Sequence, residues 1–414
     1  MKGFYLIGIF VLSLMACRSP QETSQNLLYQ LLEKQSGPIG EVLQNSAKYR
    51  LQILYTQIDR DADQNPHFSS FSYRLNEDDY FYPASSVKFP AALLALEKLK
   101  QLEIDPYTPM LTDSGAIGQS AVLTDSSSAS LLPSVAHYAR KLFLLSDNDA
   151  FNRLYEFLGQ GPLNDSLHNK GYAKTRIVHR LSIALSEEQN ATTNPLRFVQ
   201  NDSLLYQQAL AKNVKLYWDD NSILLGLGEM QSQQLLEAPK DFAHKNYFPL
   251  DEQQQMLKAI FFPEQAGQSA FDLGSEDYSF LYRAMGERPR ESDYPHYPDS
   301  IFYDGYVKFF MYGDTHDTIP DHIRIFNKVG VAYGFLTDNA YIIDLENGVE
   351  FMLSATLWTN ENQIFNDDQY EYEELGFPFL AELGRIIYAH ELKRERTVMP
   401  DLSRYWHFDR LNVR

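Results

Sequence analysis

Residues 82–102 read YPASSVKFPAALLALEKLKQL and carry a strong helix signal. From Ser85 to Leu102, side chains recur at the spacing of one helix face, which predicts a buried helix that begins at Ser85. The residues at this spacing are Ala91, Leu94, Ala95, Lys98 and Leu99. The first turn of the predicted helix therefore carries both Ser85 and Lys88.

Ser85 and Lys88 form the only Ser-x-x-Lys pair in the chain. One turn of helix places residues i and i+3 on the same face, so the lysine amine can reach the hydroxyl. A serine hydroxyl is a weak nucleophile until a neighbouring base takes its proton, and a lysine is such a base only when burial or nearby cations lower its pKa. The helix N-terminus also favours the oxyanion of an acyl-transfer intermediate. The pair predicts nucleophilic catalysis by Ser85, with Lys88 as its proton partner.

Two further motifs carry polar side chains that suit the same chemistry. Ser146-Asp147-Asn148 lies between two predicted helices, where a hydroxyl and an amide can relay a proton and hold a substrate amide. The alternative for this motif is a helix N-cap, a position that all three residue types favour. Lys328-Val329-Gly330 lies in a late β-rich segment, where the lysine supplies a cation and the glycine lets a substrate backbone approach. Its alternative is a lysine before a kink in a strand.

Strand signals stand at both ends of the chain, with helix signals between them. Strands are predicted at 50–58, 71–75, 323–330, 331–344 and 349–358, with breaks at Gly330 and at the Asn347-Gly348 turn. Helices are predicted at 134–145, 149–158, 162–170 and 372–393, and residues 197–320 are interpreted as a mixed helical and loop insertion. Since strands from both ends must meet in one sheet, the predicted fold class is α+β, a three-layer antiparallel sheet flanked by helices plus an all-helical subdomain.

In this order, the three motifs resemble those of the serine β-lactamase and penicillin-binding protein superfamily, most closely the class A β-lactamases. The interval of 61 residues between Ser85 and Ser146 is almost that of class A enzymes. Local likenesses are Tyr82-Pro83-Ala84-Ser85, Ser146-Asp147-Asn148-Asp149-Ala150 followed by Leu154 and Leu158, and Thr192-Thr193-Asn194-Pro195. The resemblance covers residues 40–200 and 320–395, and the set of motifs is specific although each member alone is not. It implies a β-lactamase/transpeptidase-like fold with the site between the sheet and the helical subdomain.

The resemblance also implies a role for each matched residue. Ser85 would be the acylated nucleophile, Lys88 the base or proton relay, and Ser146 the group that passes a proton to the leaving nitrogen. Asn148 would hold the substrate's side-chain amide, Lys328 would steer its carboxylate, and Gly330 would let its backbone approach. The oxyanion hole would be the backbone N–H groups of Ser85 and Val331.

Two positions depart from the family's pattern. Val329 stands where the family usually has a serine or threonine hydroxyl that binds the substrate carboxylate. Aligning Thr175-Arg176 with the start of the family's Ω-loop places Leu181 where class A enzymes carry the glutamate that activates water. Glu187 and Glu188 lie nearby as candidate deacylation bases, and the alternative for both is a pair of solvated loop carboxylates. The sequence thus supports acylation of a serine and leaves deacylation without an obvious base.

The N-terminus predicts export. Lys2, the apolar run from Gly3 to Ala16, and the lipobox-like Leu14-Met15-Ala16-Cys17 indicate a lipoprotein signal peptide over residues 1–16 with lipidation at Cys17, the only cysteine; the alternative is a plain secretory signal. A lipid-anchored tether and N-terminal helix would occupy 17–39, a β-lactamase-like serine hydrolase domain 40–395, and a C-terminal tail 396–414. The expected location is a bacterial membrane surface, periplasmic or outward-facing, reached through the lipid alone.

Composition limits the class of partner. Apolar residues make up 44% and charged residues 22% of the 414, as in a packed globular protein, and the formal charge of −19 argues against nucleic acid. No cofactor or metal is predicted: Asp314, His316, Asp317 and His322 lie close together but lack helical ligand spacing. The 27 Tyr and 26 Phe could line a glycan-binding face, but core packing is the preferred interpretation.

The function expected from the sequence is a monomeric serine hydrolase that cleaves a β-lactam or related amide through an acyl-Ser85 intermediate. The first alternative is a D,D-peptidase that acts on peptidoglycan stem peptides with the same residues. The second is a non-catalytic lipoprotein of the same fold that binds cell-wall fragments.

Overall fold

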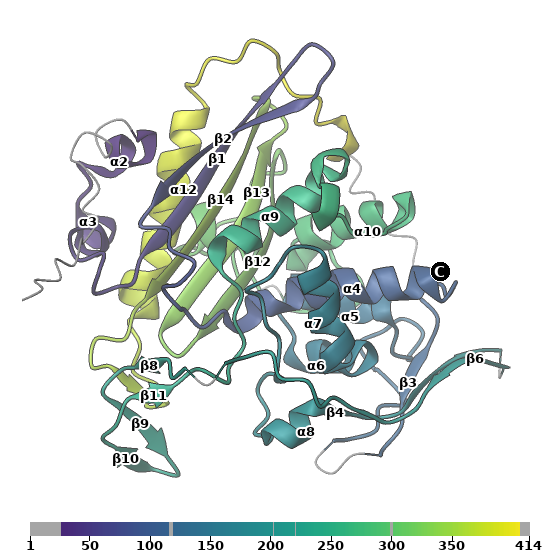
Figure 1. Ribbon diagram of the computed structural model, residues 1–414. Coiled ribbons are helices and arrows are strands. Elements are labelled where there is room, and N and C mark those ends of the chain that lie inside the picture. Colours follow the sequence, from purple (N-terminus) through teal and green to yellow (C-terminus); the bar gives the residue numbers. More distant parts are fainter. Residues whose placement is uncertain (1–25, 116–118, 202, 220, 299–300, 406–414) are drawn as a thin grey trace, which may run out of the picture.

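A computed structural model describes residues 26–115, 119–201, 203–219, 221–298 and 301–405. Figure 1 shows a twisted sheet with helices on both faces and a group of helices beside it. The signal and lipidation predictions, Cys17 included, lie outside the described residues. No helix in the described part of the chain is both long enough and apolar enough to span a bilayer.

The central sheet is antiparallel and has the strand order β12-β13-β14-β1-β2. Its strands are β1 (Gln52–Arg60), β2 (Pro66–Tyr73), β12 (Ile323–Ala332), β13 (Phe335–Asp344) and β14 (Val349–Trp358). Strands from the two ends of the chain pair directly, since Tyr55 of β1 lies opposite Leu353 of β14. Every residue of β13 and β14 is buried, as expected for central strands covered on both faces.

Two hydrophobic layers cover this sheet. On one face, α2 (Leu27–Leu32), α3 (Gly37–Gln44) and α12 (Phe377–Glu391) pack against side chains such as Ile53 and Phe351. On the other face, α9 (Leu250–Phe261) packs against side chains such as Tyr341. The second layer is continuous with the core of the helical part, so the sheet and the helices form one packed unit.

The helical part places two of the predicted motifs at helix starts. Its helices are α4 (Lys88–Gln101), α5 (Val135–Leu144), α6 (Asn148–Leu158), α7 (Gln160–Asn169) and α10 (Ser275–Gly286). Ser134 caps α5 by accepting from His137 N at 3.2 Å, and Asp147 caps α6 by accepting from Ala150 N at 2.8 Å. The cap of α6 fixes the chain direction through Ser146-Asp147-Asn148.

Short elements make up the remainder of the chain. The helices are α8 (Glu187–Ala191) and α11 (Phe309–Tyr312), and the strands are β3 (Met110–Thr112), β4 (Thr192–Thr193), β5 (Leu196–Gln200), β6 (Ser203–Gln208), β7 (Ala211–Lys212), β8 (Leu224–Leu225), β9 (Gly228–Gln231), β10 (Gln234–Leu236), β11 (Lys240–Asp241) and β15 (Ile364–Phe365). The strands form the small sheets β10-β9-β15, β11-β8, β3-β5-β6 and β4-β7. In Figure 1, β8 to β11 lie below the central sheet, and β3, β4 and β6 lie beside the helices.

The structure confirms the predicted α+β architecture and corrects three of its details. The predicted strand 71–75 lies at 66–73. Gly330 does not end a strand but lies inside β12, and the turn to β13 falls at Tyr333 and Gly334, both with positive φ. The segment 197–320 was expected to hold helix and loop, yet it contains the strands β6 to β11, and its helix α9 covers the central sheet.

Candidate active site

The turn that carries Ser85 is a short 3₁₀ segment, Ala84–Val87, that leads into α4. Ala84 has a φ of 46°, a left-handed conformation that is strained for a residue with a side chain. Ser85 is half-buried, whereas Lys88, one turn later, is completely buried. The turn therefore presents the hydroxyl at the surface of the fold and holds the amine beneath it.

Lys88 contacts three of the groups predicted to act with it. Its Nζ lies 2.9 Å from Ser85 Oγ and 2.6 Å from Asn148 Oδ1, and it also bonds the carbonyl oxygen of Ser146. Carbonyl oxygens only accept hydrogen bonds, so they take the two N–H groups of a neutral amine. The lone pair of that amine is then left for the Ser85 hydroxyl, which is the arrangement of a nucleophile with its base.

Burial also sets the charge of this lysine. It lowers the pKa of Lys88 to about 7, and the nearby Asp147 carboxylate opposes the shift without cancelling it. The pKa of Lys328 is lowered as well, first by burial and then by repulsion from Lys88. Near neutral pH, the site can therefore hold Lys88 as a neutral amine, the form that accepts a proton.

Lys328 joins this group from the sheet. Its Nζ donates to Ser146 Oγ at 2.8 Å, while Lys88 Nζ lies 3.2 Å from the same oxygen. Because Ser146 Oγ accepts from a lysine, its own proton remains available for donation to another group. Ser146 has a φ of 60°, a left-handed conformation that aims its side chain back toward Lys88 and Lys328. The three predicted motifs therefore meet at the Ser146 hydroxyl, which both Lys88 and Lys328 contact.

Gly330 lies where the sheet touches the turn that carries Ser85. A Cβ on this residue would stand 2.3 Å from Pro83 O and 3.2 Å from Ser85 N, so only glycine fits this approach. β12 is an edge of the sheet, and every second N–H of an edge strand points away from its neighbour. The predicted oxyanion hole, Ser85 N with Val331 N, would be built across this contact.

The side chain of Val329 takes no part in the group around Ser85, although its carbonyl oxygen accepts from Lys328 Nζ at 2.9 Å. Its side chain is 3% exposed and packs among the aliphatic residues on the far face of the sheet, beside Leu336 and Ala340. Successive residues of a strand point to opposite faces, so Lys328 and Val329 cannot both face the helical part. Because the side chain of Val329 faces away, Lys328 is the residue of this motif whose side chain faces Ser146.

Ser182, which the sequence did not single out, is the loop residue that contacts the site. Asn148 Nδ2 donates to Ser182 Oγ at 2.7 Å. The backbone of Leu181, which the alignment placed at the glutamate position, instead pairs with the side-chain amide of Asn152: Leu181 N donates to Oδ1 at 2.9 Å, and Nδ2 donates to Leu181 O at 3.0 Å. The loop therefore presents a hydroxyl, and not a carboxylate, to Asn148.

The two candidate deacylation bases are not brought to this group. Glu187 Oε1 lies 2.6 Å from His244 Nδ1, and Glu188 Oε1 lies 2.5 Å from Lys212 Nζ. Both carboxylates are exposed, on the first turn of α8. Within the described residues, the hydrogen bonds of Ser85, Lys88 and Ser146 involve no carboxylate side chain.

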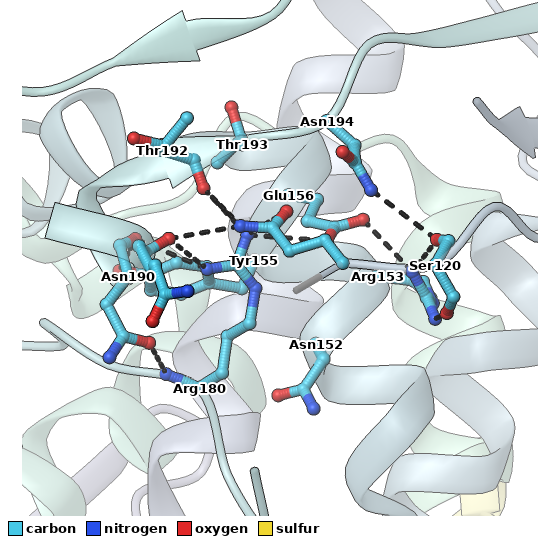
Figure 2. Close-up of polar contacts among 12 residues, drawn as sticks. Ser120, Asn152, Arg153, Tyr155, Glu156, Arg180, Asn190, Thr192, Thr193 and Asn194 are labelled. Atoms are coloured by element: carbon cyan, nitrogen blue, oxygen red, sulfur yellow. Dashed lines mark hydrogen bonds and ion pairs between the residues drawn. The ribbon is translucent and has the colours of Figure 1, made fainter. Parts of the chain in front are cut away.

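A buried polar network ties the loop that carries Ser182 to α6 (Figure 2). Arg180 donates to the carbonyl oxygens of Gln189, Asn190 and Thr192 and lies 3.3 Å from Glu156. Glu156 also lies 3.3 Å from Arg153, which holds Ser120 at 2.9 Å. Arg180, at the start of the loop, thus binds both the end of the loop at Gln189 and Asn190 and Glu156 of α6, so the network fixes the loop's position against α6.

The predicted polar loop near residue 314 carries no visible metal site. Asp314 pairs with Arg385 at 2.7 Å, and His316 stacks on Tyr303. Among residues 26–405 that the structure describes, no group of three or more His, Cys, Asp or Glu side chains is arranged to hold a metal ion.

Comparisons with known proteins agree with this arrangement. The family described as "Beta-lactamase enzyme family" matches residues 39–221, which include Ser85, Lys88, Ser146 and Asn148. No curated protein matches the chain.

Similar solved structures have low sequence identity. The β-lactamase from Sphaerobacter thermophilus is 12% identical, with 86% of this chain and 97% of that chain covered and a TM-score of 0.46. The chromosome-encoded β-lactamase of Vibrio parahaemolyticus is 11% identical, with 86% and 100% covered and a TM-score of 0.48. PBP-A is 14% identical, with 90% and 96% covered and a TM-score of 0.46. Residues 39–221 of this chain thus match the β-lactamase enzyme family, and Lys328, outside the matched range, contacts Ser146 within it.

Proposed function

We propose that this protein is a serine hydrolase of the class A β-lactamase type, which cleaves a β-lactam or related amide through an acyl-Ser85 intermediate. The observation that carries the proposal is the contact of Lys88 Nζ with Ser85 Oγ at 2.9 Å, with two carbonyl oxygens orienting the amine. A protein that only binds cell-wall fragments has no need of a buried amine beside a serine hydroxyl.

The proposed reaction uses four side chains. Neutral Lys88 takes the proton of Ser85 as Oγ attacks the carbonyl carbon, and the resulting oxyanion is stabilised by the N–H groups of Ser85 and Val331. When the carbon–nitrogen bond breaks, Ser146 donates its proton to the leaving nitrogen and regains one from protonated Lys88. Lys328 neutralises the substrate carboxylate beside Ser146. Water then cleaves the ester and restores Ser85.

The loop contact favours slow cleavage of that ester. Ser182 Oγ, a hydroxyl, occupies the contact with Asn148, and a hydroxyl does not activate water as a carboxylate does. This observation supports the second candidate function, a D,D-peptidase or transpeptidase acting on peptidoglycan stem peptides, whose β-lactam adduct would persist. The two candidates share acylation and differ in how long the acyl-enzyme lasts.

Intact mass of the soluble form, residues 18–414, tests this proposal. After mixing with a penicillin, and separately with a chromogenic cephalosporin, the protein is expected to gain one covalent adduct, because Lys88 can take the proton of Ser85. A lasting adduct would favour the D,D-peptidase candidate, in which no carboxylate activates water toward the ester. The Ser85→Ala variant is expected to gain none. A transient adduct with rapid colour change would favour β-lactamase turnover. Absence of an adduct with both drugs in the folded wild-type protein would contradict the acyl-Ser85 proposal.

We propose further that the exported protein is anchored to a bacterial membrane by a lipid on Cys17 and acts there as a monomer. When the full chain is expressed in bacteria with an alkyne-labelled fatty acid, the wild type is expected to carry the label and to sediment with membranes. Cys17→Ser is expected to lose the label, because the acceptor thiol is gone. Equal labelling of the two proteins would contradict the anchor.

A further inference from the structure

A surface pocket of about 530 Å³ lies apart from the group around Ser85. Its lining includes Tyr80, Arg176, Lys215, Tyr217, Trp218 and Tyr247, and none of Ser85, Lys88, Ser146, Asn148 or Lys328. Two segments supply most of this wall, the run 173–176 before the site loop and the run 215–219 of the insertion. The lining combines aromatic rings with three cations and three carboxylates, Glu77, Asp78 and Asp219.

Arg176 is the cation of this pocket that lacks an anionic partner. Its guanidinium lies 5.8 Å from the ring centre of Tyr80 and 5.5 Å from that of Tyr247. Its Nε donates to Lys245 O at 3.0 Å, but Nη2 is buried and has no hydrogen-bond partner among the described residues. Arginine stays charged in proteins, so this arrangement leaves part of a buried cation unsatisfied. An anion at the guanidinium would remove that cost.

The other charges of the pocket are already engaged within the protein. Lys215 pairs with Asp165 at 2.5 Å, and Lys174 pairs with Glu77 at 2.9 Å and with Asp78 at 2.7 Å. Asp219, the lining carboxylate whose charge acts on Arg176, accepts hydrogen bonds from Asn221 at 3.0 and 3.1 Å. Within the described lining, Arg176 is therefore the group that a ligand anion would meet.

The aromatic wall adds a flat surface for a ring. Trp218 is half-buried, and its ring centre lies 4.9 Å from that of His244. This ring contact holds the indole in place. Tyr217 is fixed by a hydrogen bond to Gly161 O at 2.9 Å. Indole and phenol rings offer an apolar face with a polar edge, which suits a ring that carries hydroxyl groups.

We propose that this pocket binds a saccharide that bears a carboxylate, with the carboxylate on Arg176 and the sugar ring against Trp218. A carboxylate beside the guanidinium would supply the anionic partner that the described residues do not give Arg176. The proposal concerns a site distinct from the Ser85 group and does not depend on acylation. Ligand binding is accordingly expected to be the same in the Ser85→Ala variant.

Saturation-transfer NMR titrations with three ligands test the ring contact and the carboxylate contact separately. N-acetylmuramic acid carries both ring and carboxylate, N-acetylglucosamine carries the ring alone, and D-lactate carries the carboxylate alone. N-acetylmuramic acid is expected to bind saturably, and each of the other two at least about tenfold more weakly, since each lacks one contact. Equal affinity of the two sugars, tightest binding of D-lactate, or no saturable binding of N-acetylmuramic acid would each overturn the proposal.

Variants locate the binding to this pocket. Arg176→Gln is expected to remove the preference for N-acetylmuramic acid over N-acetylglucosamine, and Trp218→Ala to weaken both sugars. Lys215→Gln is the matched control, because it removes a pocket cation that already has a partner, and the preference should survive it. Circular dichroism checks folding. If Arg176→Gln does not fold, Trp218→Ala and the comparison of the three ligands still test whether the pocket binds the saccharide. A folded Arg176→Gln variant that keeps the preference for N-acetylmuramic acid contradicts the placement of the carboxylate on Arg176.

Discussion

Replacing Lys88 by methionine is expected to slow the acylation of Ser85 by about 10³-fold, the usual contribution of a positioned general base. Methionine is of similar length and apolar, so it suits a side chain that is completely buried. It removes the one described nitrogen within hydrogen-bond distance of Ser85 Oγ, at 2.9 Å. The measurement is the second-order rate of labelling by a fluorescent penicillin, followed by stopped flow and gel.

The pH dependence of the same rate tests the assigned role. The pKa of Lys88 is lowered by burial to about 7, and only the neutral amine accepts the proton of Ser85. The wild-type rate should therefore rise as the pH increases through about 7 and reach a plateau above it. The Lys88→Met variant should lose this rise, because the group that titrates is gone.

Lys98 supplies a matched control on the same helix. It is a half-buried lysine of α4 whose pKa burial lowers to about 8, but its Nζ bonds Phe157 O and Gln208 Oε1. Lys98→Met is expected to keep both the rate of acylation and its pH profile. A Lys88→Met protein that acylates within about tenfold of the wild type would contradict the role of general base.

The contacts among the four candidate site residues could be predicted from the sequence, because they follow either from helix geometry or from the order of the motifs along the chain. Ser85 and Lys88 are one helical turn apart, so their contact follows from the helix itself. Ser146 and Lys328 lie far away in sequence, and their placement came from the order of the motifs and the resemblance. Their meeting depends on the docking of the sheet against the helical part, which no local pattern encodes.

Ser182 and Val329 show where prediction from sequence was insufficient. The contact between Ser182 and Asn148 depends on how the loop from Arg180 to Asn190 is anchored, and a loop of mixed residues has no periodicity that reveals its path. Val329 was weighed as a missing carboxylate ligand, although strand alternation already places it opposite Lys328. The alternation of side chains along a strand would have placed Val329 on the other face of the sheet, but the prediction was based on the family motif instead.

The strands within the insertion could not be predicted from the sequence for a related reason. β6 is mostly exposed, and several of its neighbours are two or three residues long. Without one buried face, a strand has no alternation of apolar and polar residues. By contrast, α9 packs on the sheet, although the sequence analysis placed it within the insertion of residues 197–320.

Replacing Glu287 by glutamine is expected to lower the free energy of unfolding by about 3 kcal/mol or more, because it leaves a buried guanidinium without its anion. Glu287 follows α10 and binds Arg140 of α5 through both oxygens, with Nε to Oε2 at 2.7 Å, and the two side chains are 3% and 8% exposed. Glutamine keeps the shape but turns an N–H group toward the arginine.

Arg140 Nη1 also donates to Tyr294 O at 2.6 Å, so the pair joins α5, which leads into Ser146, to the segment after α10. Loosening this pair should therefore disturb the approach to Ser146 as well as stability. Urea unfolding followed by circular dichroism measures the effect, with Glu382→Gln as the control. Glu382 pairs with Arg385 at 2.9 Å, but the two side chains are 42% and 40% exposed, and such pairs contribute about 0–1 kcal/mol. Because the two substitutions remove the same charge from ion pairs that differ in burial, equal unfolding midpoints for the two variants would show that burial of Arg140 is not what makes Glu287 necessary.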